Sequence, residues 1–266
     1  MINRTNVGKL HVLCSASFGA IPDFQSGPLA VGGVLYATSR ASTYAVDGVN
    51  CRRLWTATEP LPAGGGTNRG AAYAGGLLFR GFANGHVVAL SASTGRTKWD
   101  VNVLPAGSHA YLMPRRSSRR DSFSSARPAG DIAETGHMMA LEAATNATRW
   151  SVQTVPAVGS VAAQTSWKGA AHIAGGSTWT SYTLDTGTVP NLLYVSTGNP
   201  GPDFYGADRG GVNLGSESVA VFDATTGAEQ TEYQLIPHDV HDHDVGARPA
   251  SILRLGARLP LLRLRS

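Results

Sequence analysis

The chain has 266 residues, of which 15% are charged and 32 are glycine, and its formal charge at pH 7 is +4. This composition is typical of a soluble, turn-rich globular protein, and the length suffices for one large all-β domain or two ordinary domains. No apolar run reaches the ~18 residues of a membrane span, which argues against membrane insertion. The positive charge comes largely from arginines at 115–127 and 248–265, and we infer no nucleic-acid partner from it.

The N-terminal part carries neither a targeting signal nor a metal motif. Its first four residues lack the charged head and apolar stretch of a secretory signal, which leaves a cytoplasmic protein or a start upstream, and we favour the second. Cys14 and Cys51 are the two cysteines and have no metal-ligand spacing. They indicate little about the redox compartment, and a disulfide between them is an option that nothing else in the sequence supports.

Short strand pairs recur along the chain. An apolar strand, a turn and a short strand that ends in Trp follow one another at 44–55, 88–99 and 139–150, and a fourth copy at 219–231 has no Trp. Glycine in the turns supplies the positive φ that a tight hairpin needs. Another strand pair precedes each hairpin. Four short strands in a period of about 45 residues predict the blades of a β-propeller.

The tryptophans of the repeat are expected to be structural. Because Trp55, Trp99 and Trp150 occupy the same place in each copy, we expect them to pack between adjacent blades. Trp179 lies outside the repeat position and follows a glycine-rich approach, where missing side chains let a flat ligand come close to the backbone. Trp179 is therefore the candidate for stacking on a planar ring.

Two segments depart from the repeat. The segment 113–126 lies where a buried strand is required, but it is polar, basic and unpatterned, so as written we do not expect it to fill a core position. A local reading-frame slip in the coding sequence would explain it, and a real basic surface loop is the alternative. The Arg/Leu-rich end of the chain suggests a reading-frame slip as well. We expect a partial propeller over 1–247 and an irregular tail over 248–266.

Three later stretches supply the parts of a cofactor and metal site. Gly175 to Trp179 offers an aromatic platform, Ser196 to Pro200 an amide, and Pro237 to Asp244 histidines and carboxylates. A flat ring needs a face, a hard cation needs oxygen ligands and a substrate alcohol needs a base. In this order, and preceded by Asn68-Arg69-Gly70, the motifs resemble those of the alcohol dehydrogenases that use pyrroloquinoline quinone (PQQ).

The resemblance implies a fold and an activity. The fold would be all-β, an incomplete β-propeller of PQQ-type Trp-docking repeats with about four blades of an eight-bladed ring. The activity would be oxidation of a primary alcohol to an aldehyde by hydride transfer to PQQ bound to Ca²⁺ or a lanthanide ion. A cytochrome c or a membrane quinone would accept the electrons in the periplasm. Because half a ring exposes blade faces, we expect this chain alone to be weakly stable and inactive.

Individual residues are assigned by matching the motifs of that family. The Arg69 guanidinium suits a planar carboxylate, Asn199 matches the amide ligand of the metal, and Asp242 matches the catalytic base. Asp244, expected on the same strand face as Asp242, resembles the extra carboxylate of the lanthanide-using branch. The implied cofactor contacts are Gln25, Arg69, Gly130, Thr178 and Trp179, and the implied metal ligands are Asp131, Asn199, Asp242 and Asp244.

Alternatives and departures accompany these assignments. The histidines and aspartates of 238–244 suit a zinc or nickel site, although strand alternation would place His241 and His243 on the face opposite Asp242 and Asp244. The residues 64–67 replace the adjacent cysteines of the soluble enzymes, and 209–213 lacks an acid of the family loop, which leaves its rigidity open. A non-catalytic propeller like those of outer-membrane assembly lipoproteins, acting as a scaffold or binding module, is the second function considered.

Overall fold

The computed structural model describes residues 2–19, 26–60, 68–82, 84–104, 112–115, 121–126, 134–246, 249, 253–254 and 257–258. Within these ranges the chain is built from short strands, and its one α-helix, α1, spans Val161–Ser166. A 3₁₀ turn, η1, spans Val7–Lys9. None of the helices in these ranges has the length and hydropathy needed to cross a bilayer.

Four antiparallel sheets of four strands account for most of the described strands. The first two are β1 (Leu29–Val31), β2 (Val34–Thr38), β3 (Ser42–Asp47) and β4 (Arg53–Thr58), then β5 (Ala72–Ala74), β6 (Leu77–Gly81), β7 (His86–Ser91) and β8 (Thr97–Asn102). The others are β9 (Leu112–Arg115), β10 (Asp121–Ala126), β11 (His137–Glu142) and β12 (Thr148–Gln153), then β14 (Thr183–Asp185), β15 (Leu192–Ser196), β17 (Ser218–Asp223) and β18 (Glu229–Gln234). Shorter pairs are β13 (Ala174–Gly175) with β16 (Pro200–Gly201), and β19 (Leu253–Arg254) with β20 (Ala257–Arg258).

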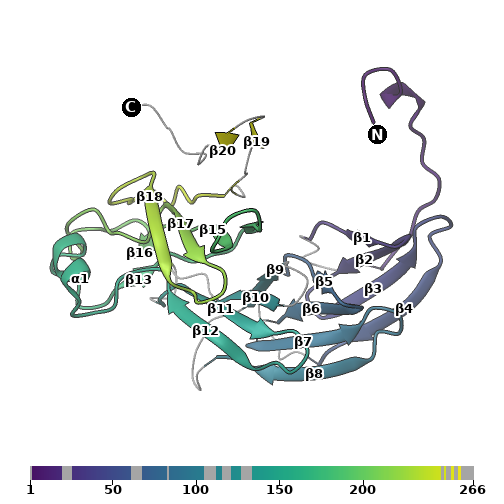
Figure 1. The fold of residues 1–266 in the computed structure, drawn as a ribbon, viewed down its shortest axis with the longest axis horizontal. Helices are drawn as coiled ribbons and strands as arrows, with labels where there is room; N and C mark the ends of the chain where they lie inside the picture. The colour runs from purple at the N-terminus through teal and green to yellow at the C-terminus, as the bar shows by residue number, and fades with distance from the viewer. Residues whose placement is uncertain are drawn as a thin grey trace.

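The four sheets are repeats of one unit. In each, the last two strands shift register by a bulge at the equivalent place, after Ala45, Ala89, Ala140 and Val221. Figure 1 shows the sheets side by side along an arc, with β1, β5 and β9 toward its inside and β4, β8 and β12 toward its outside. Sheets arranged in this way are the blades of a β-propeller, as the repeat predicts.

The core lies between the blades rather than inside any one sheet. Tyr36 and Ala45 of the first blade pack with Leu78 and Leu90 of the second, and Trp55 lies against this cluster. The third and fourth blades share a larger cluster, formed by Met138, Ala140, Trp150, Tyr182, Leu193, Val195, Ala220, Phe222 and Ala224. Each sheet therefore buries its apolar face against its neighbour along the arc.

Each repeat tryptophan joins one blade to the next, as predicted. The indole N–H donates to a turn carbonyl of the following blade, from Trp55 to Ala92 (3.0 Å), from Trp99 to Ala143 (2.9 Å) and from Trp150 to Ala224 (3.2 Å). A Cβ on Gly95 would lie 2.6 Å from the Trp55 ring, and one on Gly227 would lie 2.7 Å from the Trp150 ring. Glycine in these turns thus admits the indole as well as the positive φ.

The segment 113–126 forms strands, so the surface-loop alternative is wrong for the described part of it. The backbone of β10 pairs with β11 from Asp121↔Glu142 to Ala126↔His137, and β9 pairs with β10. The physical reason is that β11 presents a free edge, and ladder hydrogen bonds on that edge do not depend on side-chain pattern. Whether this segment fills the core stays a prediction, as does the boundary at 247.

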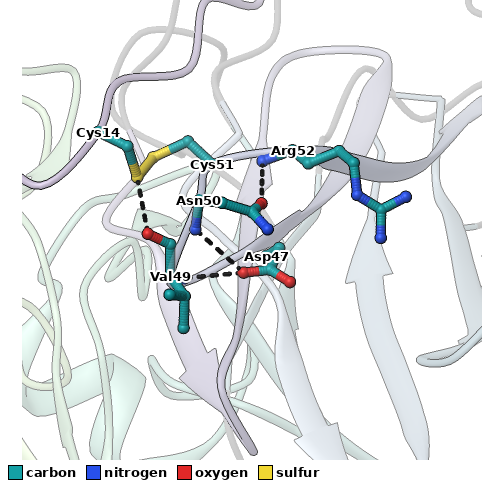
Figure 2. The surroundings of a disulfide bond; sticks show 6 residues. All are labelled: Cys14, Asp47, Val49, Asn50, Cys51 and Arg52. Atoms are coloured by element: carbon teal, nitrogen blue, oxygen red, sulfur yellow. Dashed lines mark hydrogen bonds between the residues drawn. A yellow bond between two sulfur atoms is a disulfide. The ribbon is translucent and has the colours of Figure 1, made fainter.

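A disulfide attaches the N-terminal arm to the first blade. Cys14 bonds to Cys51, and the Asp47 carboxylate accepts the N–H groups of Val49 (2.8 Å) and Asn50 (3.2 Å) to shape the turn that carries Cys51 (Figure 2). Further along the arm, Phe18 and Tyr44 lie with ring centroids 4.5 Å apart. The bond that the sequence left open is therefore formed in the fold.

Removing a docking indole should weaken the contact between two blades. We expect Trp99→Ala to lower the free energy of unfolding by about 3–5 kcal/mol, and Trp99→Phe by about 1 kcal/mol, because the second change loses mainly a hydrogen bond. Urea unfolding measures both. Thr231, exposed on β18 at the equivalent position, is the matched control, and Thr231→Ala should change stability by less than ~0.5 kcal/mol. Equal losses for Trp99→Ala and Thr231→Ala would contradict the docking role.

Removing the disulfide should release the arm. For Cys14→Ser combined with Cys51→Ser we expect a loss of about 3–4 kcal/mol, since the bond closes a loop of 37 residues in the unfolded chain. Urea unfolding with and without reductant checks this. Reductant should destabilise the parent chain and leave the double variant unchanged; a parent chain insensitive to reductant argues against the bond.

Candidate functional site

Side chains from distant parts of the sequence meet around Trp179. The Arg69 guanidinium carbon lies 5.1 Å from the centroid of the Trp179 ring, a cation–π contact. The Trp179 side chain also donates a hydrogen bond to the Asp244 carboxylate. A Cβ on Gly246 would lie 3.2 Å from the edge of the same ring, so glycine there leaves room for the indole. Arg69, Trp179 and Asp244 thus form one connected group.

Asn199 and Asp244 form the second part of the group. The backbone N–H of Asn199 donates to Asp244 Oδ1 (3.2 Å). Asn199 is buried and its Nδ2 donates to Asp203 Oδ1, so its Oδ1 is the atom that the amide can offer to a cation. Gly198 makes this approach feasible, because a Cβ there would lie 2.3 Å from Asp244 Oδ1.

The backbone of 238–244 is not a strand, which corrects two expectations. Residues 241–246 take no strand conformation, and φ is +53° at His238, +57° at Asp242 and +55° at Asp244. A left-handed residue reverses the side-chain alternation, and Asp, Asn and His adopt it more readily than most. Asp242 and Asp244 therefore do not share a strand face, and the histidines are not separated from the acids by alternation.

Asp239 organises this loop from the inside. It is 2% exposed, and its carboxylate accepts the N–H groups of His241 (3.1 Å) and His243 (3.0 Å) and Nδ1 of His243 (2.6 Å). Burial alone would raise the pKa of Asp239, but the hydrogen bonds from His243 outweigh it and lower the pKa. The same hydrogen bond raises the pKa of His243.

Three of the residues considered for a zinc or nickel site lie close together. One ligand atom each of Asp239, His241 and His243 lie within 4.8 Å of one another, and the two imidazole rings meet edge to face. Both oxygens of Asp239 already accept hydrogen bonds within the loop, however. Asp239 therefore acts as the anchor of the loop, and the two exposed histidines are left without a third ligand in this group.

A buried arginine holds the loop at 209–213, whose rigidity the sequence left open. Arg209 is 1% exposed and donates to Asn213 Oδ1 (2.7 Å), the Pro202 carbonyl (2.9 Å) and the Asp239 carbonyl (2.7 Å). Asn213 Oδ1 also lies 3.1 Å from His238 Nδ1. Burial lowers the pKa of Arg209. The loop is thus held by Arg209 and Asn213 although the family acid is absent.

Glu217 is a site residue that the sequence reasoning missed. It is fully buried directly before the apolar strand β17, and its Oε1 accepts the N–H of Asp244 (3.0 Å). Burial raises its pKa to about 7. Burial also raises the pKa of Asp244, against the hydrogen bonds from Trp179 and Asn199. The one sequence signal was a glutamate at the start of an apolar strand, which more often marks a solvated strand end.

The remaining predicted residues divide into three groups. Asp242 is exposed, and its charge raises the pKa of the neighbouring Asp244. Thr178 is buried and its hydroxyl donates to the sulfur of Met138 (3.4 Å). The predicted residues Gln25, Gly130 and Asp131, and the run 64–67, lie outside the described residues. Their contacts stay predictions.

Two family models together match most of the chain. The model described as "Glucose/ethanol/alcohol dehydrogenase, beta-propeller domain" matches residues 117–254. The model described as "Outer membrane protein assembly factor BamB" matches residues 13–116. Trp179, Asn199, Glu217 and Asp244 all lie within the first match, and Arg69 lies within the second.

Curated relatives and solved structures agree with the first model. The chain is 29% identical over 276 residues to the dehydrogenase subunit of the quinone alcohol dehydrogenase of Acetobacter aceti, covering 91% of this chain and 37% of that protein. It is 28% identical over 278 residues to subunit 1 of the cytochrome c methanol dehydrogenase of Methylobacterium organophilum, covering 91% and 44%. A europium-containing methanol dehydrogenase matches the fold with a TM-score of 0.81 at 24% identity, over 97% of this chain and 50% of that chain.

The chain spans 37% and 44% of the length of these two relatives. The expected fold, part of a β-propeller of PQQ-type repeats, is confirmed by the four sheets, the family model and the structural match.

The raised pKa of Glu217 predicts a pH dependence of stability. The stability that protonated Glu217 contributes is fully present below pH ~4.5 and is lost as the pH rises to about 7, where the folded-state group ionises. Between pH 5 and 8 we expect the metal-free parent chain to lose on the order of 2–3 kcal/mol more than Glu217→Gln. Urea unfolding across this range measures the difference. Because Asp244 and His243 are present in both proteins, parallel curves would show that Glu217 does not titrate in this window.

Proposed function

This chain belongs to the glucose/ethanol/alcohol dehydrogenase β-propeller family, and from that premise we propose that it carries the cofactor-stacking and cation-binding residues of a PQQ-dependent alcohol dehydrogenase. The observation that carries the proposal is the convergence of Arg69, Trp179, Asn199 and Asp244 into one connected group. Each was assigned from a separate motif, and the fold supplies contacts among them that the motifs alone do not require.

The residues present fit both a planar anionic cofactor and a hard cation. Arg69 and Trp179 offer a guanidinium fork and an indole, which suit the carboxylates and the ring of PQQ. The Asn199 amide and the Asp244 carboxylate are oxygen donors, which Ca²⁺ and lanthanide ions prefer. PQQ, when bound, supplies the acceptor for a hydride from the alcohol carbon.

In this mechanism the residues of the chain bind, orient and move a proton. Arg69 holds a cofactor carboxylate, and Trp179 presents its ring to the cofactor. Asn199 and Asp244 hold the cation, with Asp242 as a further ligand. Asp242 accepts the hydroxyl proton of the alcohol on a carboxylate oxygen as the hydride leaves, so that the alcohol becomes an aldehyde. The solvent exposure of Asp242 gives that proton a path to water.

Asp244 and its acidic neighbours favour a cation of high charge. Asp239 and Asp242 add negative charge close to Asp244, and each raises its pKa. Coulomb attraction to several carboxylates grows with the charge of the ion. We therefore propose that the site binds a lanthanide ion more tightly than Ca²⁺.

The disulfide supports the proposed location. The bond between Cys14 and Cys51 is of a kind that persists in oxidising compartments, including the bacterial periplasm. A cytochrome c or a membrane quinone would accept the electrons. The name of the Methylobacterium organophilum relative includes cytochrome c, and that of the Acetobacter aceti relative includes quinone. The substrate class proposed is a small primary alcohol.

The non-catalytic propeller remains the second candidate because the assembly-factor model matches residues 13–116. A scaffold built of docking blades needs the repeat tryptophans but has no use for an arginine stacked on Trp179. It also has no use for an acid cluster beside Asn199. The two candidates therefore differ in whether the chain binds PQQ.

Binding of PQQ tests the proposal directly. With La³⁺ present we expect the chain to bind PQQ, seen as quenching of tryptophan fluorescence. Arg69→Ala should weaken binding at least tenfold, since it removes a charge-assisted bidentate contact. Arg52→Ala, a change at an exposed arginine of the first blade, is the matched control and should leave binding unchanged. Absence of PQQ binding by the parent chain would favour the scaffold.

Turnover with a primary alcohol and an artificial electron acceptor tests the base. Where the loaded chain turns over, Asp242→Asn should lower kcat by about 10²–10⁴-fold while PQQ affinity changes little, because the carboxylate removes a proton in the rate-determining step. A variant with undiminished kcat would remove Asp242 from that role.

A further inference from the structure

Glu217 has a conformation and an environment that the propeller does not require. It is fully buried, and φ is +50°, a left-handed value that costs free energy for a residue other than glycine. Its Oε1 accepts the N–H of Asp244 (3.0 Å). Its Oε2 is buried and has no hydrogen-bond partner among the described residues. Strain and an unpartnered buried oxygen at one residue indicate a role outside folding.

Glu217 connects the two segments that carry Asn199 and Asp244. Its backbone N–H donates to the Gly198 carbonyl (2.9 Å), beside Asn199, while its carboxylate holds the N–H of Asp244. Its own carbonyl accepts the N–H of Leu235 (2.8 Å), at the end of β18. A shift of Glu217 would therefore move both segments relative to each other.

Among the described residues, no cationic side chain forms a hydrogen bond or an ion pair with the Glu217 carboxylate. Arg209, the buried arginine of this region, donates to one amide and two carbonyl oxygens. The charge of His243 acts on Glu217 from a distance, but its ring is hydrogen-bonded to Asp239. Asp239 and Asp244 add further negative charge near Glu217. A carboxylate kept in such a place without a partner is expensive, so a cation that offsets it has a large effect.

We infer that Glu217 is a further positioning residue of the cation site: it fixes the main chain of Asp244 and adds the buried negative charge that makes the site prefer a trivalent over a divalent cation. This rests on the proposed cation site at Asn199 and Asp244, and extends it to a residue that the motifs did not indicate. Asp244 touches the cation, and Glu217 acts on it from the buried side.

Terbium luminescence tests the inference on the full chain without PQQ. Trp179 donates to Asp244, so an ion at Asp244 should be excited through the indole. We expect the parent chain to show tryptophan-sensitised Tb³⁺ emission. Trp179→Phe should lose most of that emission yet still retain Tb³⁺ in equilibrium dialysis, which places the ion at this site. Ca²⁺ affinity follows from competition with Tb³⁺.

The selectivity of Glu217→Gln separates an electrostatic role from a merely structural one. Removing one charge weakens a trivalent ion more than a divalent ion, in a ratio of about 3:2 in free energy. We expect the Kd for Tb³⁺ to rise about tenfold and the Kd for Ca²⁺ about fivefold, in keeping with that ratio. Glu217→Asp, which keeps the charge, should recover part of the preference for Tb³⁺. Glu229→Gln, at an exposed position of β18, is the matched control and should change neither Kd.

Several outcomes would overturn the inference. It is wrong if Glu217→Gln binds Tb³⁺ as the parent does, if both ions lose the same factor, or if the parent chain binds no Tb³⁺. Urea unfolding at pH 7.5 guards against loss of fold, since metal-free Glu217→Gln should be at least as stable as the parent. Tb³⁺ binding with the expected selectivity, but without PQQ binding, would refute the proposed dehydrogenase and leave the role of Glu217 standing.

Discussion

The hydrogen bond from a tryptophan indole to the turn carbonyl of the next blade is the contact on which the rest of the structure depends. It recurs from Trp55, Trp99 and Trp150, and each indole also covers part of the core between two sheets. A single four-stranded sheet of this size buries too little apolar surface to be stable alone. Docking by these indoles supplies that surface and joins each sheet to its neighbour.

Two segments of the fourth blade, one before β17 and one after β18, bring several carboxylates together. Asp239 and Asp244 lie in the loop after β18, Glu217 lies directly before β17, and the buried guanidinium of Arg209 donates to main-chain carbonyls. The fold thus places mutually repelling carboxylates close together, and backbone hydrogen bonds keep them there. That arrangement suits a protein whose partner there is a cation.

Motifs and geometry contributed differently to the candidate site. Trp179 was singled out by its place outside the repeat, and Arg69, Asn199 and Asp244 were assigned by matching the motifs of the family that the sequence resembles. The relation between Asp242 and Asp244 was expected wrongly, since left-handed backbone at both residues abolishes strand alternation. Glu217 was missed because its importance arises from burial, and a glutamate before an apolar strand looks like an ordinary strand end.

By itself, the sequence determined the repeat, the all-β class and the docking tryptophans. The repeat period, the turn glycines and the aromatic positions are local properties, so they can be read along the chain without knowledge of tertiary contacts. Tertiary structure alone decided that Cys14 meets Cys51, that β10 completes its sheet despite an unpatterned sequence, and that Asp239 anchors its loop. Each of these three features depends on which residues, distant in sequence, become neighbours in space, and on which groups are buried from water. Burial and long-range proximity are set by packing between blades, and no pattern along the chain records them.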